Sequence, residues 1–331
     1  MRRNFFILIF LIIINFLYGE KSSFLGGSFI DDGIGARPSG LGGCYTAIAD
    51  DGNASWWNPA GLAFFDIKKK SMSFTYIPDF LNIGGNKISR FFIGYGQGDL
   101  SGYGALGASI NYLTVNIGGD YTGDNEYSWT EYVILFSWGL QIDKYIGWVK
   151  YKYPKLAIGV NLKYLSTNSD LSLDGNKVSA SGFGVDVSIL LALKDNLNIG
   201  VMGQNVFSQV KWSSGQDELV PYTLKAGIYY GITENFLLSG EIRTEENDRG
   251  IPSIYNYGFG TEYIHEFGKS IQIKKVGIRG GVTIDPNNDS YIISGGASLY
   301  MEGFSVDYTY QYFLKTLFNN NTQRFGVTVL F

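Results

Sequence analysis

The stretch Val306-Asp307-Tyr308-Thr309-Tyr310-Gln311-Tyr312 decides the fold, because apolar or aromatic residues alternate in it with polar ones. A period of two is typical of a β-strand with one apolar and one polar face. The same pattern recurs in residues 156–164, 183–189 and 275–284. About fourteen such segments are expected, beginning near residues 71, 87, 103, 129, 155, 177, 196, 221, 236, 255, 272, 291, 303 and 322. An even number of strands fits a closed antiparallel meander.

Two architectures are compatible with this alternation, a water-soluble β-sandwich and a transmembrane β-barrel. The barrel is favoured because a closed sheet pairs all its backbone polar groups inside a bilayer. Aromatic residues also recur near segment ends, where girdles of such residues meet lipid headgroups. The residues concerned are Trp129, Trp138, Tyr222, Tyr230, Tyr255 and Tyr312.

Connection lengths are a further indication, since the turns of an outer-membrane barrel are short on the periplasmic side and long outside. The short connections are expected at 193–196, 231–235, 267–270 and 302–303, and the long ones at 116–128, 205–220 and 244–254. Residues 142–153 break this rule, because they form a long connection on the expected periplasmic side.

Both ends of the sequence indicate export to an outer membrane. Arg2 and Arg3 precede an apolar run that is too short to span a bilayer, so residues 1–19 are interpreted as a signal peptide. The last segment carries apolar residues on one face and ends in Phe331. This ending resembles the strand that the outer-membrane barrel assembly machinery recognises. We therefore expect a barrel over residues 67–331, with outer-membrane lipid around it.

The composition excludes several classes of function. The 331 residues include one histidine and one cysteine, so zinc sites, disulfide frameworks and Cys/His catalysis are not expected. The net charge of −4 gives no basic field for nucleic acid. No cofactor, no metal and no catalytic residue is predicted, and the chain is not expected to be an enzyme.

Residues 20–66 differ from the rest, because they are rich in small residues and do not alternate. Asn58 followed by Pro59 predicts a helix start, since asparagine caps free N–H groups and proline suits the first helical position. The small residues would let this segment pack closely against a wall. Its most distinctive residues are Gly35, Ala36, Arg37, Gly40, Leu41, Gly42, Gly43, Asp50, Asp51, Trp57, Asn58, Pro59, Ala60, Gly61 and Leu62.

This run resembles the N-terminal signature of the PorV/PorQ family, which is related to the FadL-type outer-membrane transporters. The resemblance implies a fourteen-stranded barrel whose N-terminal segment folds into the lumen as a hatch. It also implies two functions. The first is passage or binding of hydrophobic small molecules with the hatch as the gate. The alternative is a PorV-like shuttle or scaffold subunit of a type IX secretion system, which binds exported proteins.

A set of charged residues shares the inward parity of the expected strands: Lys225, Glu241, Glu262, Arg279, Asp307 and Arg324. Opposite charges would then interleave around the lumen. The favoured interpretation is a structural network of ion pairs that anchors the hatch, for example through Arg37 or Asp50. A ring that selects the substrate is the alternative.

Overall fold

The protein is described by a computed structural model, which covers residues 33–78, 87–117, 127–145, 155–173, 176–246, 252–268, 272–287, 289–315 and 321–331. The expected signal peptide of residues 1–19 and the first part of the expected hatch lie outside the described residues. No helix in the described part of the chain is long and apolar enough to cross a membrane.

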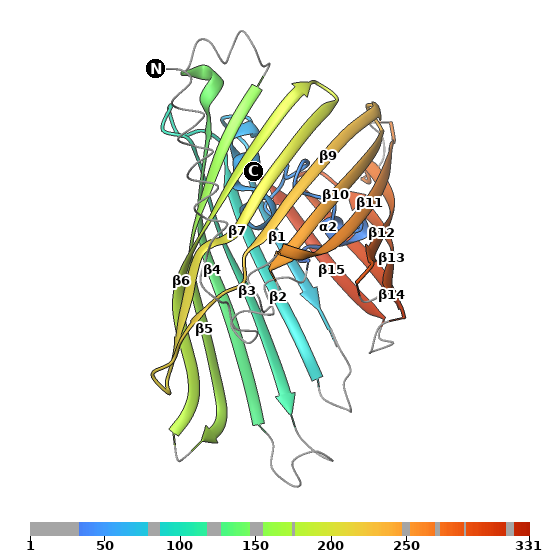
Figure 1. The fold of residues 1–331 in the computed structure, drawn as a ribbon. Helices are drawn as coiled ribbons and strands as arrows, with labels where there is room; N and C mark the ends of the chain where they lie inside the picture. Colours follow the sequence, from blue (N-terminus) through green and yellow to red (C-terminus); the bar gives the residue numbers. More distant parts are fainter. Residues whose placement is uncertain are drawn as a thin grey trace.

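The chain forms a closed antiparallel β-barrel (Figure 1). Each wall strand pairs with its neighbours in sequence, and β1 closes the ring by pairing with β15. In the described residues the ring has 14 strands, and a short fifteenth strand, β8 (Asp217–Leu219), pairs only with β7. The wall strands are β1 (Lys70–Ile77), β2 (Lys87–Gln97), β3 (Ala105–Ile117), β4 (Tyr127–Gln141), β5 (Lys155–Leu173), β6 (Asn176–Lys194), β7 (Leu197–Trp212), β9 (Thr223–Thr233), β10 (Phe236–Glu246), β11 (Pro252–Glu266), β12 (Lys275–Asp285), β13 (Ser290–Tyr300), β14 (Phe304–Leu314) and β15 (Thr322–Leu330). Every one of them begins within three residues of its predicted start, so the expected strand order and number are confirmed.

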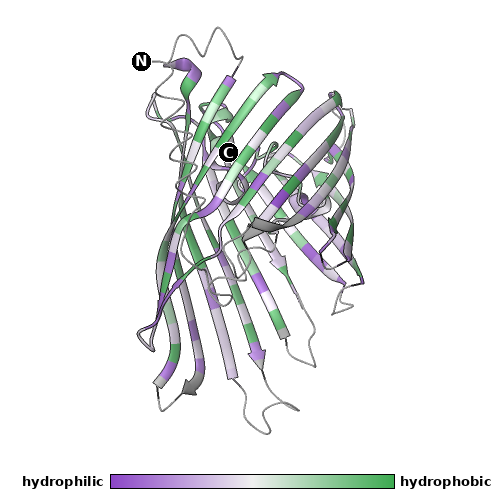
Figure 2. Ribbon diagram, in the orientation of Figure 1, coloured by the Kyte–Doolittle hydropathy of each residue, from purple (hydrophilic) through white to green (hydrophobic). Residues whose placement is uncertain are grey.

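The outer face of the wall is apolar, and polar and charged side chains face the lumen. Along β14, Val306, Tyr308 and Tyr310 are exposed, whereas Asp307 and Thr309 between them are buried. Figure 2 shows the resulting alternation of hydropathy along the strands. Outward apolar side chains on the wall include Phe74, Phe91, Ile110, Phe136, Leu162, Ile228, Ile242, Phe259, Ile278, Ile293 and Phe325. A continuous apolar outer surface on a closed sheet is that of a transmembrane barrel.

The wall is taller on one side than on the other. Strands β5 and β6 have 19 residues each, whereas β9, β10 and β12 to β14 have 11 each. With a rise of about 3.3 Å per residue and the usual tilt, the short strands span roughly 28 Å, which matches the apolar band of a membrane. The long strands exceed this by roughly 20 Å. We call β3 to β8 the tall wall; its extension lies at the distal rim, opposite the rim where β1 begins (Figure 1).

The height of this wall corrects part of the prediction for the connections. Residues 205–220 were expected to be a loop, but β7 continues to Trp212 and β8 follows it. The connection between β5 and β6 is confined to residues 174–175, although it joins strands at the distal rim, where long connections were expected. The polar residues of this region therefore extend strands beyond the apolar band instead of forming loops. Part of the exceptional connection 142–153 lies outside the described residues; Ile142–Lys144 form the short helix η4.

The predicted aromatic girdle is correct for some residues and wrong for Trp129. Tyr230 and Tyr312 are exposed on the outer face. Trp129 shares its parity with Glu131 and Val133, which are buried in the lumen. Its indole N–H donates to Glu131 Oε1 at 2.6 Å. Trp129 therefore points into the lumen, because its position on β4 has the inward parity.

Candidate functional site: the N-terminal segment in the lumen

Residues 33–66, here called the N-terminal segment, lie inside the barrel (Figure 1). They contain three short helices, α2 (Ala36–Gly40), α3 (Ala54–Trp57) and η2 (Pro59–Phe64). The last of these begins where Asn58-Pro59 predicts it, and Asn58 Oδ1 accepts a hydrogen bond from the Ala60 N–H at 3.0 Å. Gly42 and Gly43 have φ of 64° and 75°, a backbone conformation that glycine adopts without strain. They turn the chain sharply after α2.

Glycines in the wall strands leave room for the backbone of the segment to lie directly against the wall. Gly94, Gly159, Gly200 and Gly281 face the lumen on β2, β5, β7 and β12. A Cβ added at any of them would come within 3.0 Å of backbone atoms of the segment, at Gly52, Ala60, Thr46 and Gly42 respectively. The segment is thus held in niches spread around the circumference of the barrel.

Arg37 joins the segment to the wall through an ion pair with a buried carboxylate. Its Nη2 lies 2.9 Å from Glu262 Oε2 on β11, and the Glu262 side chain is fully buried. Its Nη1 lies 2.6 Å from Asp50 Oδ1 and donates to Tyr45 Oη at 2.8 Å. Tyr45 Oη in turn lies 2.8 Å from Asp51 Oδ2. One guanidinium therefore ties two parts of the segment to each other and to the barrel.

The wall continues this network beyond Arg37. Arg279 Nε lies 3.2 Å from Glu262 Oε1, and Arg279 Nη1 lies 3.1 Å from Asp307 Oδ1. All three side chains are almost completely buried, so each charge is stabilised by its partners instead of by water.

The remaining predicted charges also face the lumen and contact the segment. Glu241 Oε2 accepts hydrogen bonds from the Tyr45 and Thr46 N–H groups at 3.2 and 3.0 Å. Arg324 donates to the Gly33 carbonyl, and Lys225 Nζ lies 5.0 Å from the centre of the Trp57 ring. All six predicted wall charges are thus buried and linked, directly or through one another, to the N-terminal segment.

Asp50 and Asp51 titrate differently although they are adjacent. Partial burial raises the pKa of the Asp50 carboxyl, but Arg37 and Lys69 lower it more strongly, to about 2. Burial and the neighbouring Asp50 charge raise the pKa of Asp51.

Acid should therefore weaken the contact between Arg37 and Asp50. A folded-state pKa below the ordinary aspartate value stabilises the docked segment at neutral pH, and this stabilisation is lost as the pH falls from about 4 to about 2. Tryptophan emission of the full-length protein should report the change, because Trp56 and Trp57 belong to the segment. The Asp50→Asn variant should lack this transition, and identical titrations of the two proteins would contradict the assignment.

A second charged group lies in the lumen and was not predicted from the sequence. Lys163 Nζ on β5 lies 2.6 Å from Asp186 Oδ1 on β6, and both side chains are almost completely buried. Asn161 Nδ2 bridges from Asp186 to the Ser55 carbonyl of the segment, at 2.9 Å to each. The signal was present, since Lys163 and Asp186 lie at polar positions of the alternating stretches 156–164 and 183–189.

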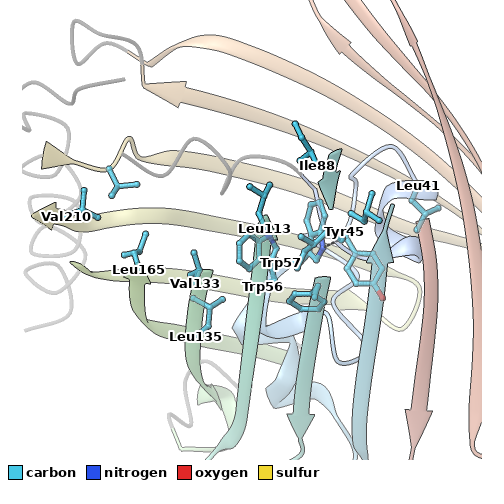
Figure 3. Close-up of a cluster of buried hydrophobic side chains, with 14 of the residues drawn as sticks. Leu41, Tyr45, Trp56, Trp57, Ile88, Leu113, Val133, Leu135, Leu165 and Val210 are labelled. Atoms are coloured by element: carbon cyan, nitrogen blue, oxygen red, sulfur yellow. Dashed lines mark hydrogen bonds between the residues drawn. The ribbon is translucent and has the colours of Figure 1, made fainter. Parts of the chain in front are cut away.

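An apolar cluster occupies the lumen between the segment and the tall wall (Figure 3). The segment contributes Trp56 and Trp57, and the strands contribute side chains that extend towards the distal rim, such as Leu165 and Val210. The apolar cluster consists of Ile34, Leu41, Tyr45, Ile48, Trp56, Trp57, Ile77, Ile88, Phe92, Leu113, Val133, Leu135, Leu165, Ala180, Val210 and Val220. It gives this side of the lumen a substantial apolar surface, next to buried polar groups such as Lys163 and Asp186.

The opposite side of the lumen is polar. A cavity of about 260 Å³ lies between the segment and strands β10 to β15, and Arg243, Asn256, Gln311 and Arg324 line it. Ser39 of the segment lines it as well. The segment therefore has an apolar interface on one side and a polar, partly open one on the other. This arrangement holds the segment both by apolar packing and by charge.

The chain is thus a transmembrane β-barrel whose lumen contains its own N-terminal segment, and solved transporters and channels for aromatic hydrocarbons have the same fold. The toluene transporter TbuX of Ralstonia pickettii aligns with a TM-score of 0.59 and 14% identity, over 90% of this chain and 97% of that chain. The toluene transporter TodX of P. putida aligns with a TM-score of 0.61 and 13% identity, over 90% and 97%. The monoaromatic hydrocarbon channel CymD gives 0.61 and 13%, over 90% and 96%. No protein-family model and no curated protein sequence matches the chain.

Proposed function

We propose that the protein is an outer-membrane channel of the FadL type, in the PorV/PorQ branch. In this proposal it binds hydrophobic small molecules and passes them across the membrane, with the N-terminal segment as the gate. The observation that carries the proposal is the apolar cluster, which extends from the segment towards the distal rim. A lumen with such a lining removes apolar surface from water, and this favours apolar ligands.

The segment fits the role of a gate because it fills the lumen and is held by non-covalent contacts. These are ion pairs, hydrogen bonds and apolar packing, which can break and form again. Its ion pair with the wall lies at β11, whereas much of the apolar cluster lies on the side of the tall wall. Hydrogen bonds join the segment to both sides, for example Glu241 to the Thr46 N–H and Asn161 to the Ser55 carbonyl. A ligand that enters the apolar cluster competes with Trp56 and Trp57 for the same surface. Passage then requires a shift of the segment and no bond chemistry.

Three observations support an outer-membrane location. The outer face of the wall is apolar over the height of the short strands. The structures with the same fold include two toluene transporters. Their identity to this chain is only 13–14%, so the shared fold is what supports the proposal. Phe331 follows directly on the closing strand β15, and it exchanges backbone hydrogen bonds with Lys70 at 3.1 and 3.2 Å. This placement is compatible with recognition by the barrel assembly machinery after export through a signal peptide.

Uptake of labelled toluene by cells that carry the protein in their outer membrane tests the proposal. We expect faster initial uptake than in matched cells without the protein. Equal rates for toluene and for long-chain fatty acids in both kinds of cell would overturn it.

A polar group within the apolar cluster should slow uptake. Leu113 is buried in the apolar cluster on the lumen side of β3, so Leu113→Asn places a polar amide among apolar side chains. An apolar ligand beside this amide would bury the polar group without a hydrogen bond, which is unfavourable by about 1–3 kcal/mol and predicts a decrease in uptake of roughly 5- to 100-fold. Ser294→Asn on the polar side, also buried, is the matched control and should retain the wild-type rate. Equal effects of both changes would indicate that the apolar cluster is not the path.

One observation favours a second function, that of a PorV-like shuttle or scaffold subunit of a type IX secretion system. The segment fills the lumen, and the tall wall extends structured strands beyond the apolar band. Such a wall offers a surface to an exported protein. Capture of cargo C-terminal domains by the purified protein, combined with unchanged toluene uptake, would favour this function over the channel.

A further inference from the structure

Two tryptophans meet inside the tall wall, at the distal end of the apolar cluster. Trp129 lies near the start of β4 and Trp212 at the end of β7, and their ring centres are 6.3 Å apart with an angle of 43° between the planes. Strands β5 and β6 separate β4 from β7 in the sheet. The two rings therefore reach each other across the concave inner face of the wall.

Both indole rings are fixed by a hydrogen bond at their polar edge. Trp129 Nε1 donates to Glu131 Oε1 at 2.6 Å, and Trp212 Nε1 donates to Glu218 Oε2 on β8. These bonds satisfy the only hydrogen-bond donor of each ring. They also set the orientation of the rings, so that the apolar faces remain available for contact.

The pair continues the apolar cluster and is more exposed than the cluster itself. Trp212 packs against the apolar cluster, whose members Leu165 and Val210 belong to the same wall. Trp129 and Trp212 are only half-buried, whereas Leu165 and Val210 are buried. The pair is thus a more exposed continuation of the apolar cluster on the tall wall.

We propose that Trp129 and Trp212 form an outer binding site that takes one flat aromatic ring between their indole faces before the ring enters the apolar cluster. This proposal rests on the proposed function. It adds which residues form the entrance to the apolar cluster and that they select aromatic over saturated molecules. A small rotation and separation of two tilted rings produces two nearly parallel faces. A flat ring then makes offset or edge contacts with both of them, whereas a puckered saturated ring of the same carbon skeleton has no π-system for such contacts.

Toluene and methylcyclohexane test this selection, since they share their carbon skeleton and differ in aromaticity. We expect wild-type cells to take up both compounds, and toluene faster. Trp212→Ala and Trp129→Ala should lower toluene uptake by about 5- to 10-fold and leave methylcyclohexane uptake within about twofold. Trp212→Phe, which keeps an aromatic face, should restore most of the toluene rate. Trp138→Ala is the matched control, because Trp138 lies at the other end of β4 and its N–H donates to the Tyr103 carbonyl.

A binding measurement on the purified full-length protein separates this inference from the proposed function. Toluene at saturation should protect part of the tryptophan emission from quenching by acrylamide, and the Trp129→Phe/Trp212→Phe double variant should lose that part. Loss of uptake of both compounds to the same degree in the alanine variants would overturn the aromatic site while leaving the channel intact. Uptake by wild-type cells no faster than by cells without the protein, together with no protection by toluene, would overturn both. Heat-modifiable migration in gels checks that each variant barrel is folded.

Discussion

Replacing Glu262 by alanine is expected to loosen the N-terminal segment more than any other single change in the charge network. The Glu262 side chain lies between Arg37 of the segment and Arg279 of the wall, at 2.9 and 3.2 Å. Its removal leaves two buried guanidinium groups without their shared carboxylate, and breaking a buried ion pair in this way is unfavourable by about 3–5 kcal/mol. Chymotrypsin should then cleave after Tyr45, which is buried in the segment, at neutral pH in the Glu262→Ala protein, but not in the wild type.

The matched control for this prediction lies on the same strand. Glu266 also forms an ion pair, with Lys275, but both side chains are about half exposed, 54% and 45%. Exposed pairs contribute little to stability, so Glu266→Ala should leave the cleavage pattern and the urea midpoint unchanged. Equal resistance of all three proteins to chymotrypsin at Tyr45 would show that the charge network does not hold the segment.

Replacing Gly281 by valine should displace the segment through steric overlap. A Cβ at this position would come within 3.0 Å of the Gly42 backbone, and neither the strand nor the sharp turn at Gly42 can yield as a flexible side chain would. We expect the lumen to open, so that ion conductance through a planar bilayer increases several-fold over the wild type.

Gly295 on the adjacent strand β13 provides the control for Gly281→Val. A Cβ added at Gly295 would meet no atom within 4 Å, because this residue faces outward. Gly295→Val should therefore retain the wild-type conductance. A closed channel in both variants would mean that the niche at Gly281 does not position the segment.

The strands were predictable because their signal is local. Alternation along Val306–Tyr312 and similar stretches determines both the strand and the side of the wall on which each residue lies. The same parity placed Glu262, Arg279 and Asp307 together in the lumen, where the structure joins them by ion pairs. Consistent use of parity would also have placed Lys163, Asp186 and Trp129 there.

Other features depend on contacts between residues far apart in the chain. The partner of Gly281 is Gly42, and the partner of Gly159 is Ala60; no local pattern marks such pairs. The height of the tall wall was also not predictable, since polar residues beyond the apolar band lose the alternation that identifies a strand. Residues 205–220 were for this reason expected to be a loop.

The N-terminal segment continues directly into β1, and this link determines how a displaced segment returns to the lumen. Lys69 donates its backbone N–H to the Asp66 carbonyl, and the next residue already belongs to the wall. A displaced segment therefore stays tethered to the barrel by its C-terminal end and swings about residues 66–69. Its return is an intramolecular step at a high effective concentration. Under the proposed function, the gate would therefore close again after each passage without an energy source or a second protein.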